Sequence, residues 1–220
     1  MTAAAPRFVV SRVLYGIVAV AALVGVLMEV VTALGSDDPG FKLVNVFSFF
    51  TIQSNILAGL AAGFLAVRPD RRGRVFAVLQ LDALLCIAVT GIVYHSVLSG
   101  LRELTAAGAF SNFLLHTLVP VGFVVAWLLV GPRPRTSIAT VGWSLLYPLA
   151  WIAYTFARGA LVDWYPYPFL DVSKIGMGDA LLRTGIVAVI FLVLAFAVLG
   201  LERLLPAAPR GSTTGRVSRA

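Results

Sequence analysis

Six apolar runs, each about as long as a helix that crosses a lipid bilayer, dominate this 220-residue sequence. A membrane-spanning helix needs about 20 consecutive, mostly apolar residues. Hydrophobic residues make up 60% of the chain and charged residues 12%, a balance that excludes an ordinary soluble globular protein. The sequence therefore predicts an all-α polytopic membrane protein, a bundle of six transmembrane helices. The runs occupy approximately residues 13–34, 44–67, 75–98, 112–130, 138–157 and 180–201.

The connectors between these runs are short, which leaves no room for a separate extramembrane domain. We expect residues 1–205 to form a single six-helix transmembrane domain. The segment 206–220 is rich in Pro, Gly, Ser and Arg, and we expect it to be a disordered cytoplasmic tail. The first apolar run exceeds the roughly 7 to 15 apolar residues of a secretory signal peptide, so we interpret it as a retained helix.

Arginine and lysine positions favour one orientation of the bundle, because cytoplasmic loops retain positive charge. With the N-terminus inside the cell, twelve of the 17 basic residues fall in cytoplasmic segments. We therefore expect a multi-pass protein of the cell membrane with both termini in the cytoplasm. Its positive charge would meet anionic lipid headgroups there. The twelve residues are Arg7, Arg12, Arg68, Arg71, Arg72, Arg74, Arg133, Arg135, Arg203, Arg210, Arg216 and Arg219.

The formal net charge of +7 does not indicate nucleic-acid binding. The basic residues are scattered singly among short connectors, and no basic motif or aromatic platform accompanies them. Motifs of several membrane enzymes are also missing: the sequence has no HExxH, no GxSxG and no P-loop. Lysine occurs at Lys42 and Lys174, both outside the expected spans, so a retinal Schiff base has no attachment point. We expect no metal and no cofactor.

A polar stretch interrupts the second apolar run, in the sequence FSFFTIQSNIL. Residues at i, i+3, i+4 and i+7 share one face of a helix. This spacing places Ser48, Thr51, Ser54 and Asn55 on one side of the second helix. Such residues usually hold membrane helices together, at about 0.6 kcal/mol per contact. A polar pocket that opens toward the outer leaflet is the alternative.

His116 in the fourth run is the strongest single indication of function. Ionisable residues inside membrane spans are costly and point to a functional site by default, although a neutral histidine can also fix helix packing. At about 1.5 Å per residue, Thr51 and His116 both lie in the outer half of the bundle. If the two helix faces meet, a hydroxyl and an imidazole come within hydrogen-bond reach.

Further polar residues are expected near the same outer layer. The segment RGALVDWYPYPFLDVSKIGMGD, residues 158–179, is long and aromatic, which suits either an anchor at the headgroup boundary or a lid over the pocket. Candidates for contacting a substrate are Arg158, Trp164, Tyr165, His95 and Glu29.

Three other features of the spans are interpreted as structural. Asp82 either forms an ion pair with one of the arginines at 71–74 or marks an ion path, and we favour the ion pair. Cys86, the single cysteine, excludes an intramolecular disulfide and is expected to be an inert packing residue. Gly59 and Gly63 belong to a face of small residues that packs helices within the bundle or between protomers.

Four features occur together in this sequence: six short-looped spans, FSFFTIQSNIL in the second span, NFLLHTLVP at the fourth and WYPYPFLDV after the fifth. In this combination the sequence resembles the bacterial Pr-six-Pr membrane proteins, which are similar to the androgen-induced-gene family of animal membrane hydrolases. The resemblance covers approximately residues 13–201. It implies an intramembrane threonine hydrolase that acts on esters of hydroxy fatty acids, with Thr51 as nucleophile and His116 as general base.

The remaining polar residues of the second run are given supporting roles in this hypothesis. Asn55, one turn from Thr51, is the candidate oxyanion donor, with Ser48 and Ser54 beside it. Membrane lipids or fatty-acyl esters are the expected partners. Two alternatives stay open: a lipid or small-amphiphile binding or transport protein without chemistry, and an acyltransferase that uses Cys86 and a histidine. The oligomeric state is also left open.

Overall fold

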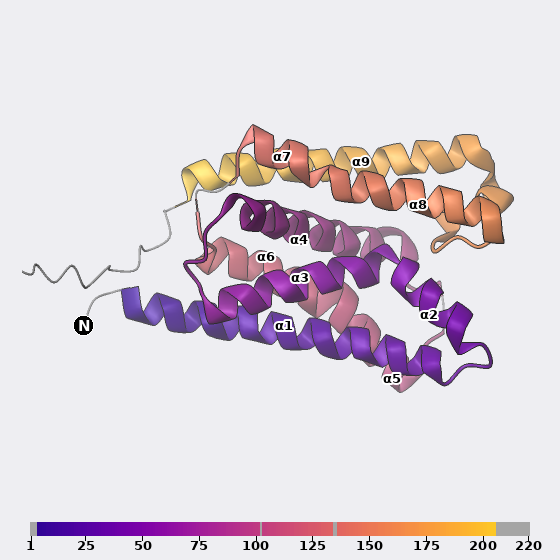
Figure 1. Ribbon diagram of the computed structural model, residues 1–220, viewed down its shortest axis with the longest axis horizontal. Coiled ribbons are helices and arrows are strands. Elements are labelled where there is room, and N and C mark those ends of the chain that lie inside the picture. Colours follow the sequence, from indigo (N-terminus) through magenta and orange to yellow (C-terminus); the bar gives the residue numbers. More distant parts are fainter. Residues whose placement is uncertain (1–3, 102, 134–135, 206–220) are drawn as a thin grey trace, which may run out of the picture.

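The computed structural model describes residues 4–101, 103–133 and 136–205 (Figure 1). The predicted tail at 206–220 lies outside the described residues. All regular secondary structure in the described part is helical, which confirms the all-α prediction. Six segments are long and apolar enough to cross a membrane, so the number of predicted spans is confirmed too. These segments are Arg7–Leu34, Phe50–Val67, Arg74–Leu98, Ala106–Val130, Ile138–Val162 and Val172–Leu204.

Several of the spans are built from more than one helix. Tyr94–Leu98 (η1) and Leu114–Leu118 (η2) are single π-helical turns that continue the neighbouring α-helices. The α-helices are α1 (Ala4–Leu34), α2 (Pro39–Ser48), α3 (Phe50–Val67), α4 (Arg74–Val93), α5 (Ala106–Phe113), α6 (Val119–Val130), α7 (Ile138–Ser144), α8 (Leu146–Val162) and α9 (Val172–Leu204), and η3 (Pro168–Leu170) is a 3₁₀ turn. Gly176 (φ 78°, ψ 158°) interrupts α9 near its start.

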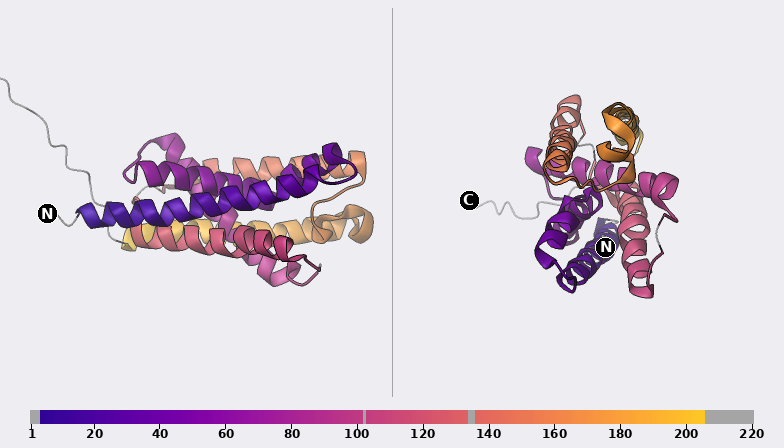
Figure 2. Two further views of the ribbon diagram at one scale, coloured as in Figure 1. Left: turned by 90° about the horizontal axis from the view of Figure 1, so that it is seen from below. Right: turned by 90° about the vertical axis from the view of Figure 1, so that its right-hand side faces the viewer.

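Helix α4 forms the centre of the bundle. It contacts α3, α6, α7 and α9, and every side chain from Leu81 to Ile87 is buried. A helix that is mostly apolar around its circumference belongs in such a position, although α4 also buries the polar side chains of Gln80, Asp82 and Thr90. Helices α1 and α3 pack together on one side of α4, while α8 and α9 run along the other side (Figures 1 and 2).

Small residues allow α1 and α3 to approach closely. Ala58 and Ala62 are completely buried, and a Cβ added to Gly59 would lie only 3.1 Å from the Cβ of Ala22. A Cβ on Gly63 would meet nothing within 4 Å. The small-residue face around Gly59 therefore packs within the bundle, as one of the two sequence alternatives proposed.

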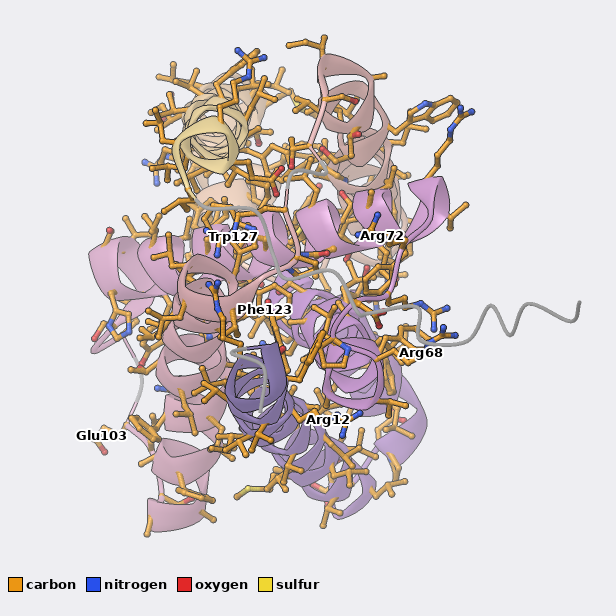
Figure 3. All side chains as sticks on the ribbon, turned by 90° about the vertical axis from the view of Figure 1, so that its left-hand side faces the viewer. Arg12, Arg68, Arg72, Glu103, Phe123 and Trp127 are labelled. Carbon is orange, nitrogen blue, oxygen red and sulfur yellow. The ribbon has the colours of Figure 1, made fainter. Side chains whose placement is uncertain are left out.

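The described chain begins and ends at the same end of the bundle (Figure 1). Viewed along the bundle from this end, Arg68 and Arg72 lie toward one side, whereas Phe123 and Trp127 lie nearer the centre (Figure 3). The α2 helix, α5 and the connector from α8 to α9 lie at the opposite end. The second end holds the candidate site.

The predicted ion pair of Asp82 is wrong. Among the described residues no arginine from 71 to 74 pairs with this carboxylate, and its Oδ1 is buried without a hydrogen-bond partner. The guanidinium of Arg71 instead lies over the rings of Phe64 and Phe76, 4.3 and 5.2 Å from their centroids. The arginine is therefore held by aromatic faces at the end of the bundle, away from the buried carboxylate.

The second span is broken where the sequence predicted a continuous helix over 44–67. Phe49 is extended (φ −68°, ψ 132°) and separates α2 from α3. The break leaves helix-end carbonyls that need donors in a water-poor environment. Gln53 Nε2 donates to Phe47 O at 2.7 Å, and Trp151 Nε1 donates to Ser48 O at 3.0 Å. Part of the polar stretch thus supports a helix break.

The fifth span also differs from its prediction. It breaks at Leu145, three residues before Pro148, whose missing N–H leaves the carbonyl of Ser144 without its helical donor. It then continues to Val162, so that Arg158 lies inside α8 and the connector to α9 is only residues 163–171. The predicted loop over 158–179 is therefore much shorter than expected.

Candidate functional site

Thr51 lies in the first turn of α3, directly after the break at Phe49. The first N–H groups of a helix have no acceptor inside the helix, and their partial positive charge favours a negative group nearby. The backbone N–H of Thr51 donates to the hydroxyl of Tyr167 at 3.0 Å. The threonine is buried, yet it is positioned at the positive end of an 18-residue helix.

His116 contacts Thr51 although the two residues are 65 positions apart in the sequence. Nε2 of the histidine lies 3.3 Å from Oγ1 of the threonine. Its Nδ1 lies 3.2 Å from the carbonyl oxygen of Asn112, which can only accept a hydrogen bond. Nδ1 therefore carries the proton and Nε2 is the acceptor. It follows that the hydroxyl of Thr51 donates to Nε2, the geometry of a nucleophile with its base.

The π-helical turn η2 carries His116 and disturbs the hydrogen bonds around it. Val119 N–H donates to Leu114 O, one residue farther back than in an α-helix, and Pro120 has no N–H to give. The carbonyl of Leu115 is consequently left without a helical donor. Nδ2 of Asn55 fills this vacancy at 3.0 Å and also donates to Thr51 O at 2.8 Å.

Asn55 therefore ties the helix of Thr51 to the helix of His116. Both hydrogens of its amide are used on backbone carbonyls, so neither is free for an oxyanion. In this conformation Asn55 therefore does not have the oxyanion role that the sequence suggested for it. Sequence spacing placed Asn55 beside Thr51 but did not indicate where its amide points.

Tyr94 supports the imidazole from the other side. Its ring stacks on the ring of His116, with centroids 4.0 Å apart and an angle of 26° between the planes. Asn112 Nδ2 donates to the Tyr94 hydroxyl at 2.6 Å. Asn112 thus holds both rings, one through its side chain and one through its carbonyl. π-Turns are frequent at functional sites, and here η1 supplies Tyr94 while η2 supplies His116.

Tyr167 is a member of the site that sequence reasoning missed. Its hydroxyl lies 3.1 Å from Oγ1 of Thr51 as well as 3.0 Å from the backbone nitrogen. Because the hydrogen of Thr51 Oγ1 is directed to His116, the phenol is the donor to Oγ1. Burial raises the pKa of Tyr167 to about 12, so the phenol keeps its proton. The motif WYPYPFLDV contained the signal, but spacing alone does not show which ring of a loop folds inward.

An apolar cavity of about 290 Å³ opens beside Thr51. Its walls come from α3, α4, α8, α9 and the loop before α9. Thr51 and Tyr167 line it near Phe50, and it extends along α9 from Thr184 to Leu192. Those nine residues cover about 12 Å of helix. His116 is absent from the lining and approaches Thr51 from another side.

The two predicted supporting serines hold helices together. Ser54 Oγ donates to Thr51 O at 3.1 Å and lies 2.8 Å from Thr90 Oγ1 on α4. Ser48 Oγ donates to Val44 O at 2.7 Å and lies 2.7 Å from the hydroxyl of Tyr154 on α8. The hydrogen-bond partners of both serines lie on the backbone and on neighbouring helices, so the structure gives both a packing role.

The candidates Arg158, Trp164 and Tyr165 do not line the cavity. Arg158 donates from Nη2 to Asn45 Oδ1 at 2.6 Å, and its guanidinium lies over the ring of Trp164 at 4.7 Å. Tyr165 packs so closely on Gly159 that a Cβ there would lie 2.1 Å from the ring. These residues fasten α2 and the connector to the end of α8.

His95 and Glu29 likewise find partners away from Thr51. Nε2 of the exposed His95 lies 3.1 Å from Thr117 Oγ1. Glu29 accepts a hydrogen bond from Ser111, while the Nδ1 position of His116 is occupied by Asn112. His116 therefore has a backbone carbonyl, and no carboxylate, on its far nitrogen.

The chain was compared with protein-family models, with curated proteins and with solved structures. None of the three comparisons found a match. What the protein does is therefore inferred from the geometry around Thr51.

Proposed function

We propose that the protein is an intramembrane hydrolase of lipid esters, with Thr51 as nucleophile and His116 as general base. One observation carries the proposal: Oγ1 of Thr51 is hydrogen-bonded to the unprotonated nitrogen of His116 and also faces an apolar cavity. A threonine hydroxyl is a weak nucleophile without such a base. A purely structural threonine in a membrane helix needs only its own i−4 carbonyl as a partner.

The reaction follows from these contacts. Oγ1 attacks the ester carbonyl carbon while its proton passes to Nε2 of His116, and the carbonyl electron pair moves to the oxygen. When this intermediate collapses, the bond to the leaving alcohol breaks and the alcohol takes the proton from Nε2. Water then attacks the acyl-threonine with His116 again as base, which releases the acid and restores Thr51.

The cavity favours lipid esters as the substrate class. Its lining is largely aliphatic and aromatic, and the only hydroxyl groups among the residues that line it belong to Thr51, Thr90, Thr184 and Tyr167. An acyl chain placed there would present its carbonyl to Thr51. Esters of hydroxy fatty acids, the substrates implied by the resemblance to the androgen-induced-gene family, fit this description. We include them in the proposal as the first substrates to test.

The orientation of the bundle in the membrane follows from where its arginines lie. The six apolar spans indicate a multi-pass membrane protein. We propose the cell membrane as its location, with the end that carries Arg12, Arg68 and Arg72 in the cytoplasm, against anionic headgroups. Thr51 and His116 would then lie toward the outer leaflet.

Covalent labelling tests the function directly. Purified protein in lipid nanodiscs is incubated with an alkyl fluorophosphonate, and the modified residue is located by mass spectrometry. We expect one adduct, on Thr51, which is lost in Thr51→Ala and in His116→Ala. Thr155→Ala removes a buried threonine outside the cavity and should label like the wild type. Hydrolysis of p-nitrophenyl esters should follow the same order.

The same experiment separates the rival functions. A protein that binds a fluorescent fatty acid but forms no adduct with fluorophosphonates of several chain lengths would be a lipid-binding protein, and the hydrolase proposal would fail. The acyltransferase alternative requires an accessible thiol, whereas Cys86 is completely buried. We therefore do not favour it.

A further inference from the structure

The hydroxyl of Tyr167 lies within hydrogen-bond distance of two atoms of Thr51. Three other tyrosine hydroxyls have partners elsewhere. The Tyr94 hydroxyl accepts from Asn112, the Tyr154 hydroxyl contacts Ser48, and the Tyr147 hydroxyl donates to Gln53. Tyr167 places its hydroxyl 3.0 Å from the backbone nitrogen of Thr51 and 3.1 Å from its Oγ1. In the proposed reaction Oγ1 forms the new bond to the ester carbonyl carbon, and the negative charge develops on the oxygen of that carbon.

We propose that Tyr167 is a catalytic residue, whose O–H stabilises the oxyanion of the tetrahedral intermediate together with the backbone N–H of Thr51. This inference rests on the proposed function. It replaces Asn55, whose amide hydrogens are occupied, with a donor that reaches the reacting atoms.

The geometry of the tetrahedral intermediate places its oxyanion close to Oγ1 of Thr51, and therefore close to the Tyr167 hydroxyl. The oxyanion and Oγ1 are bonded to the same carbon, so a donor 3.1 Å from Oγ1 is also within reach of the oxyanion. Before the reaction, the N–H of Thr51 donates to the phenol oxygen and the phenol donates to Oγ1. Once Oγ1 forms its new bond, both donors turn to the negative oxygen. The N–H comes from the first turn of α3, where the helix dipole adds to the effect.

Tyr167 takes no part in the proton balance. The proton of Thr51 moves to Nε2 of His116 and from there to the leaving alcohol, while the phenol keeps its own proton throughout. Its contribution is a hydrogen bond that is stronger in the transition state than in the ground state, which is the condition for raising kcat.

The phenol is held in place before the substrate arrives. Its ring is buried and stacks on Phe169, with centroids 5.3 Å apart and planes 6° from parallel, and it meets Phe49 edge to face at 5.5 Å. Where the same connector meets α9, Lys174 Nζ forms an ion pair with Asp171 Oδ2 at 2.8 Å. A ring fixed in this way keeps its position during the reaction, and only its O–H bond turns from Oγ1 to the oxyanion.

The test compares Tyr167→Phe with Tyr165→Phe, which removes a hydroxyl from the same connector but outside the cavity. We expect Tyr167→Phe to lower kcat and the rate constant of fluorophosphonate labelling by about 10²–10³-fold, with KM within a few-fold of wild type. Tyr165→Phe should change neither. A Tyr167→Phe protein that labels at Thr51 within about threefold of the wild-type rate would overturn the inference while leaving the hydrolase proposal intact. A wild type without any adduct on Thr51 would overturn both.

A second measurement covers the case in which Tyr167→Phe does not fold. Incorporation of 3,5-difluorotyrosine at position 167 keeps the ring and the hydroxyl but lowers the phenol pKa. An ionised phenol cannot donate, so the alkaline limb of the kcat/KM profile should move to lower pH. The same replacement at position 165 should leave the profile unchanged. Identical profiles for both proteins would exclude the oxyanion role of Tyr167.

Discussion

The amide of Asn55 donates to the carbonyl of Leu115 at 3.0 Å, across the interface between α3 and the π-turn that carries His116. This hydrogen bond supplies the donor that Pro120 cannot give. It also sets the distance between the threonine and the histidine, because the same amide holds the carbonyl of Thr51. Asn55, which the sequence suggested as a catalytic donor, therefore acts as a clamp: its amide joins α3 to the π-turn that carries His116.

We expect Asn55→Ala to weaken both stability and activity. The variant leaves the buried carbonyl of Leu115 unsatisfied, at a cost of about 1–3 kcal/mol. Loss of the clamp should also slow fluorophosphonate labelling by about tenfold or more, because small misplacements of catalytic groups are costly. Thermal unfolding in one detergent and labelling rates measure the two effects. Thr32→Ala, an exposed threonine bonded to its own helix, is the control, and equal behaviour of both variants would contradict the clamp.

Gly91→Ala tests the close approach of α4 to the same π-turn. A Cβ at Gly91 would lie 2.9 Å from Pro120 Cβ and 3.6 Å from His116 O, so α4 and the π-turn must separate. We expect a destabilisation of about 1–3 kcal/mol, typical of overpacking, and slower labelling of Thr51. Gly63→Ala has open space and should be neutral or stabilising by up to about 1 kcal/mol. A Gly91→Ala protein as stable as Gly63→Ala would show that the helices do not pack as described.

Ala188→Phe tests whether the cavity holds the acyl chain. Ala188 lines the cavity on α9, and a phenyl ring would fill part of its volume. We expect kcat/KM for long-chain p-nitrophenyl esters to fall about tenfold relative to short-chain esters, since overfilling a packed site costs about 1–3 kcal/mol. Ala197→Phe places the same ring on the exposed surface of α9 and serves as control. An unchanged chain-length profile in Ala188→Phe would place the acyl chain elsewhere.

The raised pKa of Tyr167 predicts a loss of stability in alkali. Burial favours the neutral phenol, so the pKa is about 12 in the folded protein against an ordinary value of 10.0. The folded protein holds the Tyr167 proton more tightly than the unfolded chain does, and this contributes to the free energy of unfolding. The contribution is complete below pH 10. It is lost as the pH rises from about 10 toward 12, by up to about 1.4 kcal/mol per pH unit. Unfolding of wild type and Tyr167→Phe is compared from pH 8 to pH 11.5. The free energy of unfolding of the wild type minus that of Tyr167→Phe should be constant below pH 10 and fall above it, because only the wild type has the phenol proton to lose. A value that stays constant up to pH 11.5 would contradict the prediction.

Cys86→Ala should preserve the reaction. The thiol is completely buried on α4 and has no place in the proposed mechanism. We expect iodoacetamide to leave Cys86 unmodified until the protein unfolds, and Cys86→Ala to label at Thr51 at the wild-type rate. Loss of acyl transfer or of labelling in this variant would instead support the acyltransferase alternative.

The sequence by itself determined the number of membrane spans and the layer in which the polar residues gather. Apolar runs must form helices in lipid because every backbone group needs a partner inside the segment. A constant rise per residue then brings Thr51 and His116 to similar depth. Both conclusions depend on local properties of the chain, and local properties can be read from one sequence.

Only the tertiary structure decided which polar groups serve the site. The break at Phe49, the direction of the Asn55 amide and the inward turn of Tyr167 all depend on donors or acceptors from distant segments. A carbonyl freed by Pro120 or by the break acquires its partner only when the helices pack, so the pairing cannot be deduced from spacing along one helix. For the same reason Arg158 and Asp82, prominent as charges in the sequence, found surroundings that their positions in the chain did not predict.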